Sequence, residues 1–490
     1  MERTPSHPKS TSDAEKDSSV DYVEAGELDF QSSLEKAVLT KMDIRILPLV
    51  TLLYLLAYLD RSNIGNARVA GMQKELHMSN AQYSIALTVT TIPYIMAEIP
   101  SNLLLKTVGP NLMLPTMASL WGIVTIMQGL VHNYHGLIAC RFFLGLLEGG
   151  LFPGIILYLS SFYPRQRLQL RIAVFFSAVS LSGAFSGLLA FAIIKMDGVG
   201  GRPGWAWIFF LEGLCTVVVG VLSFFVLPRS VEDARFLNES EKELVLKQLR
   251  KDGIISQDSQ ADNLNWKEIG RAFALPQVWF SSSIFFFAGI ILSSLSYFTP
   301  SILVGLGYTA SRAQLMSVPP FAAGFVVTML TSLFSDKYGH RGYSAMVASI
   351  LCTIGFAMYF KSRNLHVQYG SLFFSIAGIN CSGPALATWL ANNAAPQSRR
   401  ATAIAIGFIS TNLGNIIATW LYSAWSHPPR YTSGTITLLV GSIMMTVLAF
   451  SNILYLKGQN RKKALIRQRI SREEEPEGLG DHSAWFIYST

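Results

Sequence analysis

The chain has 490 residues, of which 50 % are hydrophobic and only 14 % are charged. Soluble proteins carry about 25 % charged residues, so this composition excludes an ordinary soluble domain and indicates a protein with many membrane spans. A net charge of +8 also occurs in proteins that bind nucleic acids, but here lysine and arginine concentrate in alternate loops. That distribution is a signal of membrane topology, and it argues against nucleic acid as a partner.

The N-terminal segment is polar and mixed in charge up to about residue 40, so we expect no cleavable signal peptide there. We predict that residues 1–43 form a cytosolic N-terminal tail and residues 458–490 a cytosolic C-terminal tail. Both tails have the composition of largely disordered segments, because they offer few apolar residues to bury.

Apolar runs long enough to cross a bilayer follow one another between polar loops. The first six lie at about 44–67, 82–106, 111–131, 137–162, 170–195 and 205–228. Six more lie at about 276–300, 314–335, 343–361, 368–392, 400–424 and 433–457. The sequence therefore predicts an all-α membrane protein with twelve transmembrane helices in two six-helix halves, 44–228 and 273–457. The cytosolic loop between them, 229–272, is either a short amphipathic helix or a solvated linker.

The first apolar run, IRILPLVTLLYLLAYL, ends at Leu59 and leads directly into Asp60 and Arg61. From Ile44 to Leu59 it covers about 16 residues, or roughly 24 Å of helix, whereas a span takes about 20 residues. If the helix ends at Leu59, the two charges are an ordinary polar flank. We favour a helix that continues to about Ala67, which places Asp60 and Arg61 in the outer third of the membrane, facing protein or a cavity.

The loops that lie inside when both termini are cytosolic carry most of the positive charge, including RQRLQLR, DKYGHR and RKKALIRQR. The opposite loops carry few lysines and arginines. Because cytosolic loops of membrane proteins are enriched in these residues, the distribution supports cytosolic termini.

The two halves also resemble each other. YPRQRLQLRIAVFFSAVSLSGAFSGLLA follows the fourth run and APQSRRATAIAIGFISTNLGNIIAT follows the tenth, with Pro164 aligned to Pro396 and Arg167 to Arg399. A parallel repeat of this kind places a binding site near the membrane midplane between the halves. The alternative is that any cytosolic loop followed by a helix rich in small residues shows the same likeness.

Cofactor and metal chemistry have no signal in the sequence. The four cysteines form no CxxC pair and show no metal spacing, and the glycines of SLSGAFSGLLA fit close helix packing. There is no Walker motif. We therefore expect a protein that is not an enzyme, uses no cofactor, and draws its energy from a gradient.

Three stretches carry a family resemblance: YLDRSNIGNARVAGM, YIMAEIPSNLLLK and RFFLGLLEGGLFPGIILYLSSFY. With SDKYGHRG after the eighth run, they resemble the major facilitator superfamily, and within it the fungal anion:cation symporter family of allantoate, nicotinate, pantothenate and biotin permeases. The resemblance covers about 40–457. The first copy of the superfamily's loop motif, KTVGPNLML, lacks the usual acidic residue, whereas the second keeps it. The resemblance implies gating roles for Asp336 and Arg341.

The resemblance further implies that Arg61 and Arg141 bind an organic anion and that Asp60 and Glu148 carry the coupled proton. Arginine grips a carboxylate with two parallel hydrogen bonds, and a buried acid changes protonation when a neighbouring arginine is engaged. Arg141 and Glu148, seven residues apart, share a helix face about 10 Å apart along the axis. We predict that the two acids and two bases share one watery cleft; the alternative is a salt-bridge lattice that only holds two spans together.

Other polar and aromatic side chains are candidates for contacting the rest of the solute, or alternatively for interhelical hydrogen bonds and aromatic belts. They are Tyr58, Tyr94, Trp389, Asn392, Asn393, Asn412 and Asn415. Glu98 is predicted as a gate or a loop anchor, and Glu212 as a structural residue or a proton carrier.

Together these features predict a secondary active transporter of the plasma membrane that imports a small organic anion, of vitamin or nitrogen-metabolite type, by proton symport and works as a monomer. One alternative is an exporter of a carboxylated secondary metabolite, since alternating access is reversible. Another is a nutrient sensor that binds without transporting, for which we would expect longer and more specific cytosolic extensions.

Overall fold

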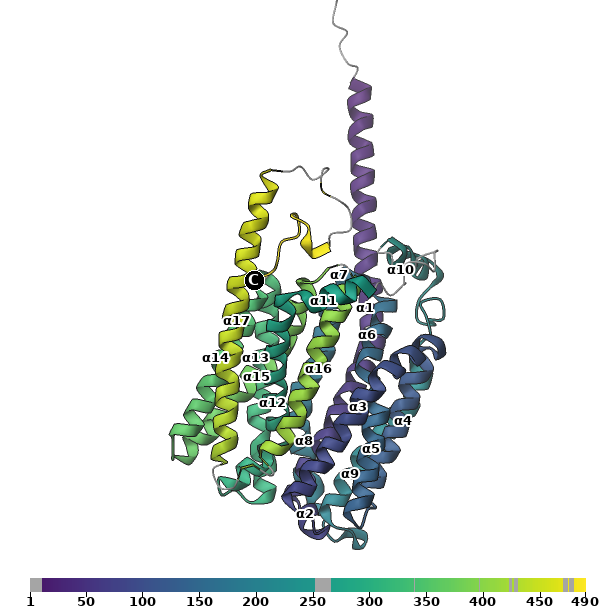
Figure 1. The fold of residues 1–490 in the computed structure, drawn as a ribbon. Helices are drawn as coiled ribbons and strands as arrows, with labels where there is room; N and C mark the ends of the chain where they lie inside the picture. Colours follow the sequence, from purple (N-terminus) through teal and green to yellow (C-terminus); the bar gives the residue numbers. More distant parts are fainter. Residues whose placement is uncertain are drawn as a thin grey trace, which may run out of the picture.

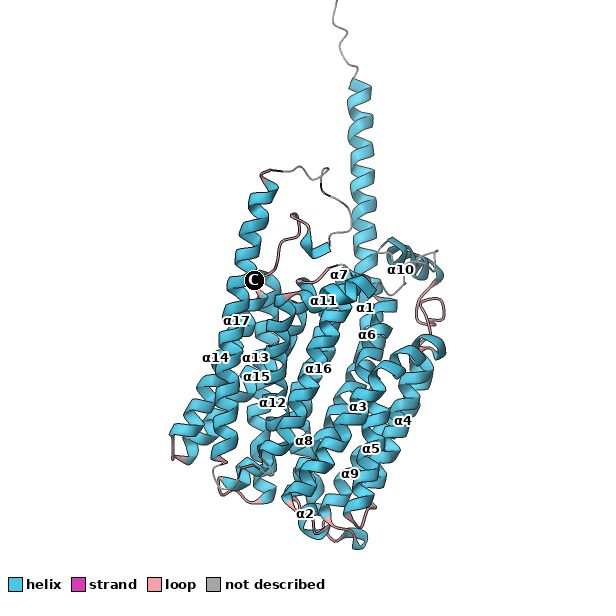
Figure 2. Cartoon of the chain, in the orientation of Figure 1, coloured by secondary structure: helices cyan, strands magenta, loops and turns pink. Residues whose placement is uncertain are grey.

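The computed structural model is all-helical in its described part, which comprises residues 11–251, 266–338, 340–395, 397–422, 425–426, 431–469, 475 and 480–490. Long helices run side by side in one bundle (Figures 1 and 2), and the N-terminal helix and the last residues of the chain lie at the same end of it. We call this end the terminal face and the other end the opposite face.

The predicted fold of two six-helix halves is confirmed, and most helix ends lie within a few residues of the predicted runs. The first half consists of α1 (Thr11–Val69), α3 (Asn80–Val108), α4 (Pro110–Gln128), α5 (Tyr134–Glu148) continued by α6 (Leu151–Phe162), α7 (Arg165–Phe176) continued by α8 (Ala178–Ile193), and α9 (Gly204–Val226). The second half consists of α12 (Pro276–Gly305), α13 (Ala310–Tyr338), α14 (Arg341–Lys361), α15 (Leu365–Asn392), α16 (Gln397–Leu421) and α17 (Thr432–Arg467). Within the described residues, 9 helical stretches are long and apolar enough to cross a membrane by length and composition alone.

Two spans that the sequence predicts as continuous are each built from two helices. The fourth span breaks at Gly149–Gly150, and the fifth breaks at Ser177. Glycine also lets α5 lie directly against α3, because a Cβ atom at Gly145 would collide with the backbone oxygen of Thr90. This close packing fixes the height of α5 relative to α3, and with it the position of the charged residues on α5.

The loop between the halves contains helices. α10 (Glu239–Lys251) lies in the predicted amphipathic stretch, and α11 (Trp266–Ala274) leads into the second half. Both lie at the terminal face in Figure 1. Lys41 of α1 binds Glu241 of α10, with the Lys41 Nζ atom 3.0 Å from the carboxylate. Of the two alternatives for the loop, the helix is therefore the one that the structure shows.

The predicted disorder of the N-terminal tail is wrong for its described residues. Helix α1 begins at Thr11 and continues without interruption past Leu59 to Val69. Extending an existing helix needs no new nucleus, and the stretch before the span is rich in the helix formers Glu, Lys, Leu and Ala. The same continuity places Asp60 and Arg61 inside a helix, as predicted, and not after its end.

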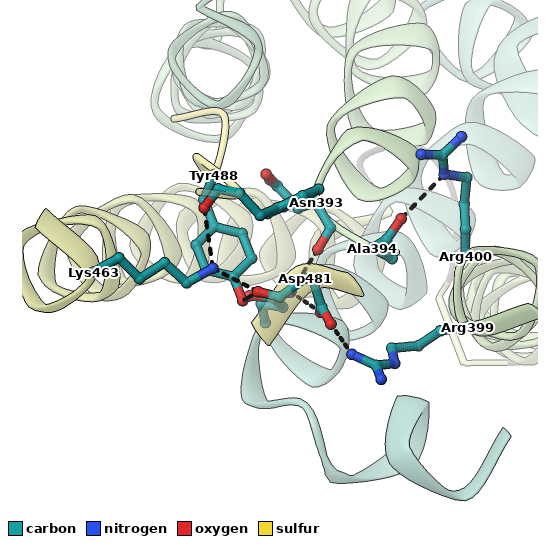
Figure 3. A network of polar contacts seen from close by, with 9 residues as sticks. Asn393, Ala394, Arg399, Arg400, Lys463, Asp481 and Tyr488 are labelled. Carbon is teal, nitrogen blue, oxygen red and sulfur yellow. Dashed lines mark hydrogen bonds and ion pairs between the residues drawn. The ribbon is translucent and has the colours of Figure 1, made fainter. Parts of the chain in front are cut away.

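The predicted disorder of the C-terminal tail is also wrong for its described residues. α17 continues beyond the predicted end of its span to Arg467, and residues 480–490 lie against the terminal face of the second half. Asp481 forms an ion pair with Arg399 in which both side chains are 0 % exposed. Lys463 Nζ donates a hydrogen bond to the Asp481 backbone oxygen at 2.5 Å. Figure 3 shows these side chains converging on Asp481.

Two residues predicted to bind solute hold this segment. Trp389 Nε1 donates to the Ser489 backbone oxygen at 2.9 Å. Asn393 Nδ2 donates to the same oxygen at 3.0 Å, and Asn393 Oδ1 accepts from the Ser489 backbone N–H at 2.8 Å. Both residues lie at the terminal end of α15, where the segment covers them in this structure, and a role for them in binding solute stays a prediction.

We expect Asp481→Ala to destabilise the second half, because it leaves Arg399 buried without its carboxylate. Breaking a buried ion pair by removing one partner costs about 3–5 kcal/mol. The measurement is the thermal unfolding midpoint of the detergent-solubilised protein, which should fall. Glu239→Ala is the control, since this carboxylate pairs with Lys242 at 2.8 Å but is 90 % exposed. Equal midpoints for the two variants would contradict a structural role for the segment.

Candidate functional site

A buried ion pair lies in the first half, between α1 and α5. Arg61 Nε is 2.9 Å from Glu148 Oε1, and the side chain of Glu148 is 1 % exposed whereas that of Arg61 is 20 % exposed. The acid is therefore fully enclosed, while the Arg61 side chain keeps part of its surface open. Of the four charged residues predicted for the site, these two are in direct contact.

Two of the predicted aromatic residues surround Arg61. Its guanidinium carbon lies 4.5 Å from the centre of the Tyr94 ring and 5.3 Å from that of Tyr58. A Cβ atom at Gly149 would collide with the Tyr94 backbone oxygen, so glycine at this break allows α3 to approach. Glu98, half-buried one turn along α3, lies within electrostatic reach of Arg61. Cation–π contacts of this kind orient the guanidinium group.

The Asp60 side chain points away from Arg61 and the tyrosines around it, although Asp60 precedes Arg61 in the sequence. Its side chain is buried with 1 % exposure, and its Oδ2 atom accepts hydrogen bonds from Trp121 Nε1 at 3.1 Å and Thr216 Oγ1 at 3.0 Å. Because successive residues on a helix point about 100° apart, Asp60 and Arg61 bond to different neighbours, and a cleft common to all four charged residues stays a prediction. Asp60 lies in the packed interface of α1, α4 and α9.

Arg141 is enclosed as well. It is 1 % exposed, and its guanidinium carbon lies 5.9 Å from the centre of the Phe209 ring. Tyr83 and Tyr297 lie within electrostatic reach of it. A solute therefore has no access to Arg141 in this structure, and its anion-binding role stays a prediction that requires the halves to separate.

Tyr297 on α12 is a residue of the site that the sequence analysis missed. It is half-buried and lies within electrostatic reach of Arg61 and Arg141. A Cβ atom at Gly65 would collide with the Tyr297 backbone oxygen, so α1 and α12 are in direct contact here. The stretch SSLSYFTPS, which places several hydroxyl groups inside an apolar span, is the signal that could have found it.

The two halves touch on the side of the site toward the opposite face. Ser84 Oγ donates to the Thr419 backbone oxygen at 3.0 Å, and Gln314 Nε2 donates to the Asn66 backbone oxygen at 3.4 Å. Each of these bonds joins a helix of the first half to a helix of the second. They hold the two halves together on this side of the site.

The halves also touch toward the terminal face, where the ring centres of Phe152 and Phe408 are 4.7 Å apart. Between the two contacts lies a cavity of about 20 Å³ lined by Tyr58, Ser186 and Phe321 among others. That volume suits about one water molecule. This cavity is therefore too small for an organic anion, and we call the arrangement seen here the closed form.

The other predicted residues lie in the second half. Asn415 Nδ2 donates to Asn412 Oδ1 at 3.2 Å, and Ser293 Oγ donates to Asn415 Oδ1 at 2.6 Å. The first bond lies within α16, whereas the second joins α12 to α16 and is the interhelical bonding named as the alternative. A solute contact of Asn412 stays a prediction. Arg341 is the first residue of α14 and half-buried, whereas the side chain of Asp336 lies outside the described ones. The gating roles stay predictions.

The site thus combines a cation, a carboxyl group and phenol rings. This set suits an anion with a flat or apolar body, since arginine binds carboxylates and tyrosine rings provide apolar contact with a polar tip. Within the described residues there is no group of three or more His, Cys, Asp or Glu side chains that could hold a metal ion.

Comparison with known proteins agrees with the fold. The family model of the Major Facilitator Superfamily matches residues 50–419. The chain belongs to this superfamily. As a major facilitator superfamily protein it is a multi-pass membrane transporter and not an enzyme. An uncharacterised transporter of Schizosaccharomyces pombe is 37 % identical over 429 residues, which cover 87 % of this chain and 85 % of the relative.

One similar superfamily member has a named solute. The high-affinity nicotinic acid transporter of Saccharomyces cerevisiae is 32 % identical over 462 residues, covering 93 % of this chain and 85 % of the relative. Among solved structures, a bacterial homologue of the human lysosomal transporter Spinster has a TM-score of 0.66 at 16 % identity, over 86 % of this chain and 96 % of that one. The D-xylose-proton symporter has a TM-score of 0.63 at 15 % identity, over 82 % and 97 %. At these identities the structures show the fold alone.

Proposed function

We propose that this transporter carries a small organic anion into the cell together with protons, in the manner of the fungal anion:cation symporters that its sequence resembles. The proposal places the protein in the plasma membrane as a monomer, with the terminal face in the cytosol. The halves 44–228 and 273–457 are the units that move. The observation that carries the proposal is the buried pair of Arg61 and Glu148, in which the base keeps an open surface and the acid does not.

The coupling follows from an exchange of partners at Arg61. In the closed form, Arg61 is held by Glu148 at 2.9 Å. An incoming carboxylate binds the same guanidinium group through two parallel hydrogen bonds and displaces Glu148. A buried carboxylate without a cation is costly, so Glu148 binds a proton as the solute arrives. Anion and proton then cross together, and both leave when Arg61 and Glu148 pair again.

Aromatic monocarboxylates fit this site well. Tyr58 and Tyr94 lie beside the guanidinium group of Arg61, where their rings can contact the body of a flat acid while its carboxylate binds the arginine. Nicotinate is the first probe to use, because the relative that is 32 % identical is a nicotinic acid transporter.

Uptake of labelled nicotinate by purified protein in proteoliposomes tests the proposal. With an inward proton gradient, we expect nicotinate to accumulate at least tenfold above its outside concentration. A protonophore should abolish this accumulation. Equal nicotinate uptake with and without the proton gradient would contradict symport. If nicotinate fails, the same assay with allantoate, pantothenate and biotin decides whether any carboxylate is carried.

Export remains the second candidate, because the partner exchange at Arg61 runs equally well in reverse. Vesicles loaded with solute distinguish the two directions. With an inward proton gradient, an importer releases nicotinate more slowly than without the gradient. An exporter that exchanges protons for solute releases nicotinate faster with the gradient than without it.

A further inference from the structure

Polar side chains face each other between α1 and α9, inside the first half. The hydrogen bond of 3.0 Å from Thr216 Oγ1 to Asp60 Oδ2 sets the register of the two helices. As the first and sixth spans they run in opposite directions, so Asn63, one turn after Asp60, is level with Glu212, one turn before Thr216. Asn63 is 0 % exposed and Glu212 is 4 % exposed. An amide and a second acid therefore follow Asp60 toward the opposite face.

α4 adds a third row of polar groups. Trp121 Nε1 donates to Asp60 Oδ2 at 3.1 Å. Thr125 and Gln128 follow Trp121 by four and seven residues, which puts all three on one helix face, and all three are 0 % exposed. We call the side chains that meet between these helices the polar column: Asp60, Asn63, Thr125, Gln128, Glu212 and Thr216.

Most polar atoms of the polar column form no hydrogen bond of good geometry within the described residues. Glu212 and Asn63 lie close enough to interact with each other, but the carboxyl oxygens of Glu212, the amide atoms of Asn63 and Gln128, and the Thr125 hydroxyl all fall outside that geometry. Burying such groups without hydrogen bonds is unfavourable. Ionisable groups inside a membrane protein usually belong to a proton or ion pathway, and groups this close together can be joined by a chain of water molecules.

We propose that the polar column is a proton pathway, which leads from the opposite face through Glu212 to Asp60 and is separate from the solute path between the halves. This inference rests on the proton coupling proposed above and names the route by which the proton enters.

Each end of the polar column lies near a carboxyl group that can supply or receive a proton. Toward the opposite face, Trp205 lies two turns before Glu212 on α9, and its Nε1 atom donates to Glu75 Oε2 at 2.8 Å. Glu75, on the short helix α2 (Met72–Glu75), is exposed and offers the first carboxylate to the surrounding water. Toward the site, Asp60 is within electrostatic reach of Glu148. The pathway therefore ends beside the acid that binds the proton during transport.

The relay moves one proton at a time. A proton from water binds the Glu212 carboxylate and forms an O–H bond. That bond breaks as the proton passes along the polar column to the Asp60 carboxylate, which leaves Glu212 free for the next proton. Asp60 then releases the proton to Glu148 once the solute has taken Arg61. Besides these acids, the ionisable groups that reach the column are Arg141 and, at the outside of the bundle, Cys215.

Accessibility to Ag⁺ tests the pathway without any solute. The background has the four native cysteines, Cys140, Cys215, Cys352 and Cys381, replaced by alanine. Ag⁺ is small enough to enter wherever water enters, and it binds the introduced cysteine thiol. A thiol that has bound Ag⁺ is no longer labelled by maleimide after the protein is denatured, so the loss of labelling measures the reaction. Gln128→Cys and Glu212→Cys should react at least tenfold faster than Ala118→Cys, whose site on α4 is also 0 % exposed but lies outside the polar column. Equal rates at the three sites would overturn the pathway.

Proton counting gives the second test. In proteoliposomes, wild-type nicotinate uptake should make the outer medium more alkaline, and Glu212→Leu should lower the protons moved per nicotinate at least tenfold. Exchange of labelled for unlabelled nicotinate should continue in Glu212→Leu, which shows that the variant is folded, and Glu212→Asp should restore proton movement. If wild type moves nicotinate without protons, the proposed function fails. If wild type moves protons and Glu212→Leu moves as many, only the pathway fails.

Discussion

Glu148→Gln is expected to abolish uphill accumulation of nicotinate while exchange of labelled for unlabelled nicotinate continues. Glutamine has the shape and the hydrogen-bonding groups of a protonated carboxyl group, but it has no proton to release. The loaded carrier can therefore reorient with Arg61 holding the solute. The empty carrier no longer re-forms the ion pair that is 2.9 Å long in the closed structure, so no proton gradient drives net uptake.

The measurement is the ratio of inside to outside nicotinate in proteoliposomes with an inward proton gradient. The ratio should fall to about one for Glu148→Gln, while the exchange rate stays within about threefold of wild type. Glu98→Gln is a matched control, because this carboxyl group also lies within electrostatic reach of Arg61, whereas the ion pair of Arg61 is with Glu148. If Glu148→Gln accumulates nicotinate as wild type does, the proton does not travel on Glu148.

The fold was largely predictable because the bilayer imposes a simple rule on sequence. Each span needs about 20 apolar residues with its backbone hydrogen bonds satisfied inside the helix, so the apolar runs mark the helices directly. The start of α12 at Pro276 matches the predicted residue, and α4, predicted at about 111–131, is found at Pro110–Gln128. The break at Gly149–Gly150 was not predicted, because two glycines in a membrane helix are also common in unbroken ones.

The site was predictable only in part, because a sequence fixes which helix carries a residue more readily than which way the side chain points. Arg61 and Glu148, two of the four charged residues singled out in the sequence, form an ion pair, whereas Asp60 bonds to Trp121 and Thr216. The partners of Asp60 lie 61 and 156 residues away in the chain, and no local pattern reveals such contacts.

The docked C-terminal segment escaped prediction for a similar reason. Its contacts with the second half use backbone groups, as when Ser489 bonds to Trp389 and Asn393. Any sequence can offer backbone groups, so composition says nothing about them. Side chains of the segment also take part, as in the ion pair of Asp481 with Arg399 and the Tyr488 ring centre 4.0 Å from Lys463 Nζ, but these contacts depend on partners that only the folded chain brings together.

Arg61→Lys is expected to raise the apparent KM for nicotinate at least tenfold, which corresponds to about 1.4 kcal/mol of lost binding. Lysine keeps the positive charge but loses the planar fork that binds both carboxylate oxygens. It also loses the broad flat cation that lies 4.5 Å from the Tyr94 ring centre. Arg68→Lys is the matched control, because Arg68 is on the same helix and lies 4.4 Å from the Tyr83 ring centre, yet it bonds to Gln73 and Asn80 at the opposite face.

Arg61→Ala separates binding from folding. Alone, it leaves Glu148 buried without a cation, which should destabilise the protein by several kcal/mol. Adding Glu148→Gln removes the unpaired charge, so the double variant should recover the unfolding midpoint of wild type in detergent. It should still fail to bind nicotinate, with an affinity lower by roughly a hundredfold, since hydrogen bonds to a charged group contribute about 1.5–3 kcal/mol. Wild-type affinity in the double variant would show that Arg61 only pairs with Glu148, and that the anion binds elsewhere in the bundle.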